Sequence, residues 1–329
     1  MTDIGSSEVL ELPPASTADF VALLKPRVMS LVVFTALAGM VAAPGSVHPV
    51  LGAIAVFAIA LGAGAAGALN MWFDADIDAK MSRTRRRPIP AGKLRASDAL
   101  SFGLFLSIVA VFLLGAAANT FAAAFLAFTI FFYVVIYSMG LKRRTPQNIV
   151  IGGAAGAFPP MIGWAVATGG VDINAFLMFA IIMLWTPPHF WALALYKRGD
   201  YAAAGVPMLP VVKGAAVTRR QIMIYSVLVS ITGILPVVTG LGGLIYAVVS
   251  IGAGGLFLVL AGRVFFSLAG SERGQSKEHL YEVVKGDRAA RDLFAFSIFY
   301  LFSLFAALLV EHGAGLYFKF PLKFLGGLI

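Results

Sequence analysis

The sequence contains no cysteine among its 329 residues. Disulfide bonds and thiolate metal sites are therefore excluded. Charged residues are also scarce, at 12% of the chain against 60% hydrophobic residues. A soluble domain of this size could not bury so much apolar surface. The composition thus indicates an all-α, polytopic integral membrane protein.

Nine apolar segments are long enough to span a bilayer. They cover residues 28–44, 50–73, 97–117, 121–140, 149–168, 174–195, 221–240, 243–268 and 292–311. We expect one transmembrane domain over residues 25–312 and a C-terminal tail over 313–329. Residues 1–24 are predicted to form a flexible cytoplasmic tail, with an interfacial piece near Phe20–Leu24.

Basic residues are distributed unevenly between the two sides of this predicted domain. No lysine or arginine occurs in one set of turns, at residues 44–50, 117–121, 168–174 and 240–243. Apart from Lys319 and Lys323, the basic residues lie in the N-terminal segment or in and beside the other turns. The positive-inside rule places the N-terminus and those turns in the cytoplasm. The net charge of +9 follows from this bias and does not indicate nucleic-acid binding, because the basic residues occupy separate loops beside membrane spans.

Three polar side chains close the second apolar segment. Asn70, Asp74 and Asp78 are spaced four residues apart, so on a helix they drift by only about 80° and share one face. Asp76 lies on another side and is expected to be solvated. Acidic residues at the end of a membrane helix are costly and by default indicate a functional site. The alternative is a helix end solvated by cytoplasmic water.

A run of arginines follows this acidic motif directly. It begins at Arg83 and ends at Arg87, which precedes the rigid Pro88-Ile89-Pro90. Carboxylates beside arginines suit a magnesium-bound polyphosphate, because Mg²⁺ takes a few carboxylate oxygens plus phosphate oxygens and arginine forks bind the remaining phosphate oxygens. We predict that Arg83 and Arg87 contact phosphate. A signal for membrane topology is the alternative for any one arginine.

Two further polar clusters close the fourth and sixth segments. Lys142 and Arg143 follow the fourth, and Asn148 opens the fifth, where a helix N-terminus beside cations favours an anion. Lys197 and Asp200 close the sixth. If these loops converge on the acidic motif, the five side chains complete a diphosphate site. Otherwise the cations serve topology, and Lys197 with Asp200 is a solvated pair.

His189 lies inside the sixth segment, beside Pro188 and close to Trp191. Its imidazole either hydrogen-bonds a carbonyl of a neighbouring helix or contacts a substrate, and an iron atom is one such contact. The sequence has no His, Asp and Glu grouping with zinc spacing, no glycine-rich phosphate loop and no nucleophile elbow.

The motif Asn70-x-x-x-Asp74-x-x-x-Asp78 resembles the first aspartate motif of the UbiA superfamily of intramembrane prenyltransferases. Longer stretches resemble the haem-farnesylating branch, the protohaem IX farnesyltransferases (haem O synthases). These are residues 70–78, 87–90, 145–153, 187–191 and 204–210, and the likeness covers roughly residues 25–310. One departure concerns the second aspartate motif, where Lys197 and Tyr201 occupy the aligned positions and Asp200 is the acidic residue left.

The resemblance implies nine transmembrane helices around a central cavity capped by cytoplasmic loops, in a bacterial cytoplasmic membrane. It implies transfer of a farnesyl group from farnesyl diphosphate to a vinyl group of haem B, with Mg²⁺ as cofactor, giving haem O. The expected partners are these substrates and the lipid bilayer, with haem A synthase as a candidate downstream partner. The expected roles are metal binding by Asn70, Asp74 and Asp78, catalysis by these three with Lys197 and Asp200, diphosphate binding by Arg83, Arg87, Lys142, Arg143, Asn148 and Lys197, and haem contact by His189 and Trp191.

Two other functions stay open. One is prenylation of an aromatic acid or a quinone precursor by another enzyme of the superfamily, which the Pro187-Pro-His-Phe-Trp191 segment disfavours. The other is transport, because carboxylates in membranes also mark ion paths. The acidic motif lies at a helix end, however, and no charged broken helix is predicted near the membrane midplane.

Overall fold

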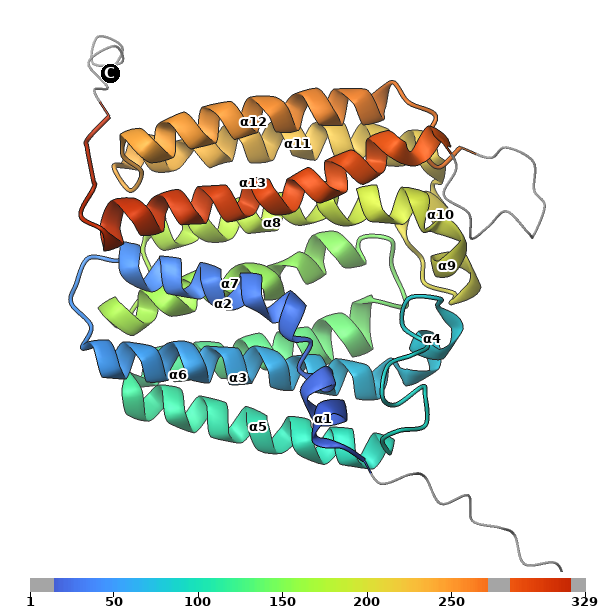
Figure 1. Ribbon diagram of the computed structural model, residues 1–329, viewed down its shortest axis with the longest axis horizontal. Helices are drawn as coiled ribbons and strands as arrows, with labels where there is room; N and C mark the ends of the chain where they lie inside the picture. The colour runs from blue at the N-terminus through green and yellow to red at the C-terminus, as the bar shows by residue number, and fades with distance from the viewer. Residues whose placement is uncertain (1–14, 272–284, 321–329) are drawn as a thin grey trace, which may run out of the picture.

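The computed structural model describes residues 15–271 and 285–320, and within these ranges it contains helices and no strands. The long helices lie side by side and the short ones α4, α9 and α10 gather at one end (Figure 1). The helices are α1 (Thr17–Leu23), α2 (Pro26–Ala42), α3 (Pro49–Phe73), α4 (Ala75–Lys80), α5 (Ala96–Ala117), α6 (Thr120–Phe131), η1 (Phe132–Leu141), α7 (Asn148–Thr168), α8 (Ile173–Tyr196), α9 (Arg198–Ala203), α10 (Leu209–Val212), α11 (Gly214–Thr239), α12 (Leu244–Phe265), η3 (Lys285–Asp287) and α13 (Arg288–Gly313). The predicted all-α class is confirmed.

The long helices also confirm the predicted membrane architecture. Eight spans among the described residues are long and apolar enough to cross a bilayer, with α6 and η1 counted together. Helices α1 and α2, which meet at a bend of 52°, make a ninth if they form one span. The largest shift in a boundary is in α11, which begins at Gly214 and not at residue 221. Hydropathy marks where a helix enters the apolar layer. Helix α11 starts before that point, and its first two turns include Arg219 and Arg220.

Helix α1 occupies the last part of the segment predicted as an N-terminal tail. Ser16 and Asp19 form a capping box at its start, in which each side chain bonds the backbone N–H of the other residue. Leu23 is fully buried and packs beside Ala68 and Met71 of α3. The chain therefore already contacts the bundle before α2 begins.

Glycine permits the closest helix contacts in the bundle. A Cβ atom at Gly163 of α7 would lie 1.9 Å from the carbonyl oxygen of Ala36 in α2. One at Gly39 of α2 would lie 2.2 Å from the carbonyl oxygen of Pro160 in α7. The two helices thus touch backbone to backbone, as small residues allow in membrane proteins.

The two ends of the bundle differ in charge. The segments that contain α4, α9 and α10 carry Arg83, Arg87 and Lys197 of the predicted site, and we call this side the charged end (Figure 1). The turns at the opposite end, between α2 and α3, α7 and α8, and α11 and α12, contain no lysine or arginine. The fold therefore keeps the predicted separation of basic and neutral turns.

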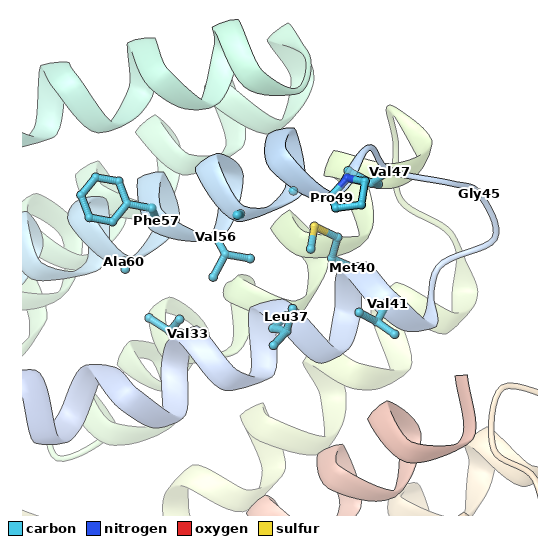
Figure 2. Close-up of a pocket in the computed structure, with 12 residues that line it drawn as sticks. Val33, Leu37, Met40, Val41, Gly45, Val47, Pro49, Val56, Phe57 and Ala60 are labelled. Carbon is cyan, nitrogen blue, oxygen red and sulfur yellow. The ribbon is translucent and has the colours of Figure 1, made fainter. Parts of the chain in front are cut away.

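An apolar cavity of about 670 Å³ lies between α2 and α3 in the half of the bundle away from the charged end. Val33 and Leu37 of α2 face Val56 of α3 across it (Figure 2). Ala60, its lining residue nearest in sequence to Asp74, is about 21 Å from it along the helix. Because no charged side chain lines this cavity, it is not the predicted diphosphate site.

Candidate functional site

The acidic motif lies where α3 gives way to α4. Asp74 stands at the junction, with φ of −92° and ψ of 10°, so the helix bends there. Its amide still donates to the carbonyl of Asn70 at 2.9 Å, and the amide of Asp78 donates to the carbonyl of Asp74 at 2.8 Å. This helical bonding keeps the three side chains in the expected order, and all three are buried.

Buried carboxylates need compensating charges, and each of the two has its own cation. Lys142 forms an ion pair with Asp74. Arg87 donates from Nη1 to Oδ2 of Asp78 at 2.6 Å. The carboxylates are thus neutralised by side chains of the loops that the sequence predicted to converge.

Asn70 of α3 is bonded to η1 and to the residue that precedes α2. Its Nδ2 donates to Oδ2 of Asp74 at 2.6 Å and to Oγ of Ser138 at 3.0 Å. Its Oδ1 accepts a hydrogen bond from Nζ of Lys25 at 2.7 Å. Lys25 precedes α2 and has a left-handed backbone with φ of 51°, which is rare for a residue with a side chain. Sequence reasoning missed Lys25 because it lies 45 residues from Asn70 and outside every motif.

Ser138 lies in the π-helix η1, and Lys142 directly follows it. In η1 the hydrogen bonds skip one more residue than in an α-helix, and the amide of Lys142 accordingly donates to the carbonyl of Tyr137, five residues back, at 2.9 Å. The Ser138 hydroxyl donates to the carbonyl of Tyr133 at 2.8 Å. The extra residue per turn changes which side chains face α3. Such segments are frequent at functional sites.

Arg143 forms an ion pair with Asp76. Its Nη1 and Nη2 donate to the two oxygens of Asp76 at 2.9 and 2.7 Å. These hydrogen bonds hold the pKa of the Asp76 carboxyl below its usual value. Arg143 also lies 4.8 Å above the ring of Phe73, and its Nη2 is 3.6 Å from Oδ1 of Asp74. Asp76 is exposed, as expected, but it is paired.

The third polar cluster, Lys197 and Asp200, lies at the start of α9. Oδ2 of buried Asp200 accepts a hydrogen bond from the Ser82 hydroxyl at 2.7 Å, which joins α9 to the loop after α4. Burial raises the pKa of the Tyr201 hydroxyl, and the neighbouring Arg83 guanidinium acts in the opposite direction. Lys197 is partly buried, and its side chain makes no hydrogen bond or ion pair with the described residues. The alternative reading of Lys197 and Asp200 as an ion pair is therefore not supported by the described contacts.

Apolar contacts hold these clusters together. Ile77 and Met81 of the α4 region pack with Ile149 of α7 and with Tyr201 of α9. Asn148 starts α7, is buried, and donates from Nδ2 to the carbonyl of Lys142 at 3.0 Å. The structure thus brings the three clusters to one end of the bundle.

Three buried oxygen atoms at this end have no hydrogen-bond partner. They are Oδ1 of Asp74, Oδ1 of Asn148 and Oδ1 of Asp200. An unpaired buried acceptor costs about 1–3 kcal/mol, and carboxylate and amide oxygens are ligands that Mg²⁺ accepts. Among the described residues no three His, Asp or Glu side chains form a protein-only metal site. The oxygens therefore suit a magnesium ion that takes further ligands from phosphate.

His189 and Trp191 point to different helices. The His189 ring contacts α13, where Nδ1 lies 2.6 Å from the hydroxyl of Ser297. A bond to a neighbouring helix, the alternative to haem contact, is thus present, but its partner is a hydroxyl and not a carbonyl. Trp191 packs edge-on against Tyr225 of α11, and its buried Nε1 has no partner. This burial leaves Trp191 little surface for a ligand.

The sequence is similar to curated proteins over most of its length. Residues 32–281 match the UbiA prenyltransferase family. The chain is 60% identical to the protoheme IX farnesyltransferase of Maricaulis maris over 307 residues, which cover 93% of each protein. It is 61% identical to that of Caulobacter vibrioides over 305 residues, covering 90% of this chain and 91% of the relative.

Solved structures show the same fold at low identity. A digeranylgeranylglyceryl phosphate synthase matches with a TM-score of 0.67 and 17% identity, covering 89% of this chain and 98% of that one. A UbiA homologue from Archaeoglobus fulgidus, bound to DMAPP and Mg²⁺, matches with a TM-score of 0.60 and 15% identity, covering 89% and 99%. The resemblance drawn from the motifs is confirmed, and the chain belongs to the UbiA prenyltransferase family.

Proposed function

We propose that this protein transfers a farnesyl group from farnesyl diphosphate to a vinyl group of haem B, forming haem O and diphosphate. Similarity to protoheme IX farnesyltransferases over more than nine-tenths of the chain supports this function. The observation that carries it within the structure is the meeting of Asp74 and Asp78 with Lys142 and Arg87 at the charged end.

In this reaction the bond between the allylic carbon and the diphosphate oxygen breaks, and its electron pair leaves with diphosphate. The vinyl group supplies the electrons for the new carbon–carbon bond. Water then adds a hydroxyl group and releases a proton. The apolar interior of the helix bundle keeps bulk water from the allylic cation.

The cations of the site stabilise the leaving diphosphate. Arg87 and Lys142 each form an ion pair with a carboxylate, and their remaining N–H groups are available to phosphate oxygens. Arg83, Arg143 and Lys197 add positive charge around the same end. Preformed charges aimed at a leaving group are usually the largest contribution to such catalysis.

Asp74 and Asp78 would hold magnesium at this site, and Asn70, whose Oδ1 already accepts a hydrogen bond from Lys25, would position Asp74 through its Nδ2. When bound, Mg²⁺ supplies Lewis-acid stabilisation of the diphosphate charge. The unpaired oxygens of Asn148 and Asp200 are further ligand candidates, either directly or through water. With one aspartate in the second cluster, the site is asymmetric, and Lys197 provides charge where other family members have a carboxylate.

We place the protein in the bacterial cytoplasmic membrane with its N-terminus and charged end in the cytoplasm. The distribution of basic residues supports this orientation. Farnesyl diphosphate, which is anionic, would then enter from the cytoplasmic side. A haem A synthase is the candidate consumer of the product.

Mass analysis of products tests the function. The purified protein is given farnesyl diphosphate and Mg²⁺, with either haem B or 4-hydroxybenzoate as the acceptor. We expect haem O from the first acceptor and its loss when a chelator removes magnesium. Prenylated 4-hydroxybenzoate without haem O would assign the protein to another branch of the family. Uptake of diphosphate into vesicles without any product would indicate a transporter.

A further inference from the structure

The imidazole of His189 is covered on both faces. Trp185, one helical turn earlier in α8, stacks on it with ring centres 4.3 Å apart and planes 18° apart. Phe294 of α13 stacks with centres 4.5 Å apart and planes 23° apart. The two stacking contacts therefore fix the plane of the ring between α8 and α13.

The hydrogen bonds of Ser297 determine where His189 carries its proton. The Ser297 hydroxyl lies 2.6 Å from the carbonyl oxygen of Phe294. Two oxygens at this distance need a proton between them, so the single proton of the hydroxyl points to that carbonyl. The same hydroxyl lies 2.6 Å from Nδ1 of His189 and must accept a hydrogen bond there. Nδ1 is therefore protonated, and the neutral ring carries its lone pair on Nε2.

Ser297 also fixes the stacking partner. Nε1 of Trp185 donates to the backbone carbonyl of Ser297 at 2.7 Å. One residue of α13 thus sets both the tautomer of His189 and the position of the indole above it. This is the arrangement in which metal-binding histidines occur, because a hydrogen bond at one ring nitrogen orients the other toward the metal.

The edge of the ring that carries Nε2 is the part left for a ligand. Both faces and Nδ1 are occupied, and His189 retains 7% of its surface. Nε2 makes no hydrogen bond with the described residues, and it is not fully enclosed. His189 lies seven residues before Tyr196, about 10 Å along α8 from the charged end. A lone pair at this depth suits an iron centre, whereas a propionate would require a hydrogen-bond donor.

We propose that Ser297 is a positioning residue that holds His189 in the Nδ1–H form, so that Nε2 binds the iron of the haem substrate. This proposal rests on the proposed function and assigns the contact that the haem makes on α8. Iron ligation would hold the macrocycle in one orientation beyond the diphosphate site, with a vinyl group free to react.

Comparison of haem B with metal-free protoporphyrin IX tests the proposal, because the two differ in iron. Binding is followed by absorbance titration of the full-length protein in detergent. We expect the wild type to bind haem B more tightly than protoporphyrin IX. The variant His189→Ala should lose this preference while its affinity for protoporphyrin IX and for magnesium diphosphate is retained. Added imidazole should restore the absorbance spectrum of bound haem.

Two serine variants test the positioning role. Ser297→Ala should reduce the preference for haem B over protoporphyrin IX by about tenfold, the usual scale for loss of such a hydrogen bond. Ser297→Thr, which keeps the hydroxyl, should restore it. Ser303→Ala is the matched control, since the Ser303 hydroxyl also bonds a carbonyl of its own helix α13 but contacts no histidine.

The outcomes separate this proposal from the proposed function. A preference for haem B that survives His189→Ala overturns iron ligation by His189. Equal loss of affinity for both porphyrins in Ser297→Ala shows that Ser297 is only structural. A wild type that binds both porphyrins equally overturns the inference but leaves the farnesyl transfer standing. A wild type that binds neither overturns both.

Discussion

At the scale of single residues, the site is a set of buried charges that compensate one another. Asp74 and Asp78 are buried, and each has one cation at hydrogen-bonding distance. Removing one partner of a buried pair is destabilising, because it leaves a charge without compensation. Substitutions here therefore need two measurements, one of activity and one of the amount of folded protein.

We expect Asp74→Asn and Asp78→Asn each to reduce haem O formation by at least about 100-fold, the scale on which single electrostatic contributions to catalysis are lost. Asparagine keeps the shape and removes the charge that would hold magnesium. The rate is measured with folded protein normalised by gel filtration. Asp98→Asn is the control, because Asp98 pairs with the exposed Arg95 and neither residue is assigned to the site. Near-normal rates for Asp74→Asn or Asp78→Asn would contradict the metal assignment.

Arg87→Ala should raise the apparent KM for farnesyl diphosphate by about tenfold or more, which corresponds to one charge-assisted hydrogen bond of about 1.4 kcal/mol. The KM for haem B should change little, because Arg87 lies at the charged end beside Asp78. Arg85→Ala, at an exposed position of the same loop, is the control and should leave both values unchanged. A raised KM for haem B alone would reverse the assignment.

Part of the site could be predicted from residue spacing and part could not. The i, i+4, i+8 pattern found Asn70, Asp74 and Asp78, since their contacts are set within one helix. Lys25 and Ser138 were missed because they reach Asn70 from distant segments. Their contacts depend on how whole helices pack, which local spacing does not encode.

At the scale of elements, the hydropathy pattern found the spans but not their irregularities. It cannot reveal that η1 is a π-helix, because the hydrogen-bond register changes without any change in polarity. It also placed the start of α11 late, because a helix continues beyond the apolar layer.

Gly163→Ala should destabilise the protein by about 1–3 kcal/mol, the usual cost of overpacking. The added Cβ would meet the carbonyl of Ala36 at 1.9 Å, and backbone atoms of α2 cannot move aside as a side chain could. The midpoint of thermal unfolding in detergent measures the effect. Gly156→Ala in the same helix is the control, because nothing lies within 4 Å of a Cβ there and alanine favours the helix. Equal midpoints for both variants would show that α2 and α7 pack less closely.

At the scale of the whole molecule, charge separates the two ends of the bundle. The site's cations give the end that carries them a positive excess. In the proposed function, diphosphate binding and membrane orientation would thus depend on the same residues. The sequence predicted this separation well because it depends on composition along the chain and not on side-chain geometry.

The absence of cysteine makes the orientation directly measurable. Single variants Arg85→Cys, in the loop before α5, and Val171→Cys, in the turn before α8, place one exposed thiol at each end. In intact spheroplasts a membrane-impermeant maleimide should label Val171→Cys and not Arg85→Cys, because basic loops remain in the cytoplasm. After permeabilisation both should be labelled, which controls for reactivity, and the unsubstituted protein should not react. Labelling of Arg85→Cys in sealed spheroplasts would place the diphosphate site on the outer side and contradict entry of the substrate from the cytoplasm.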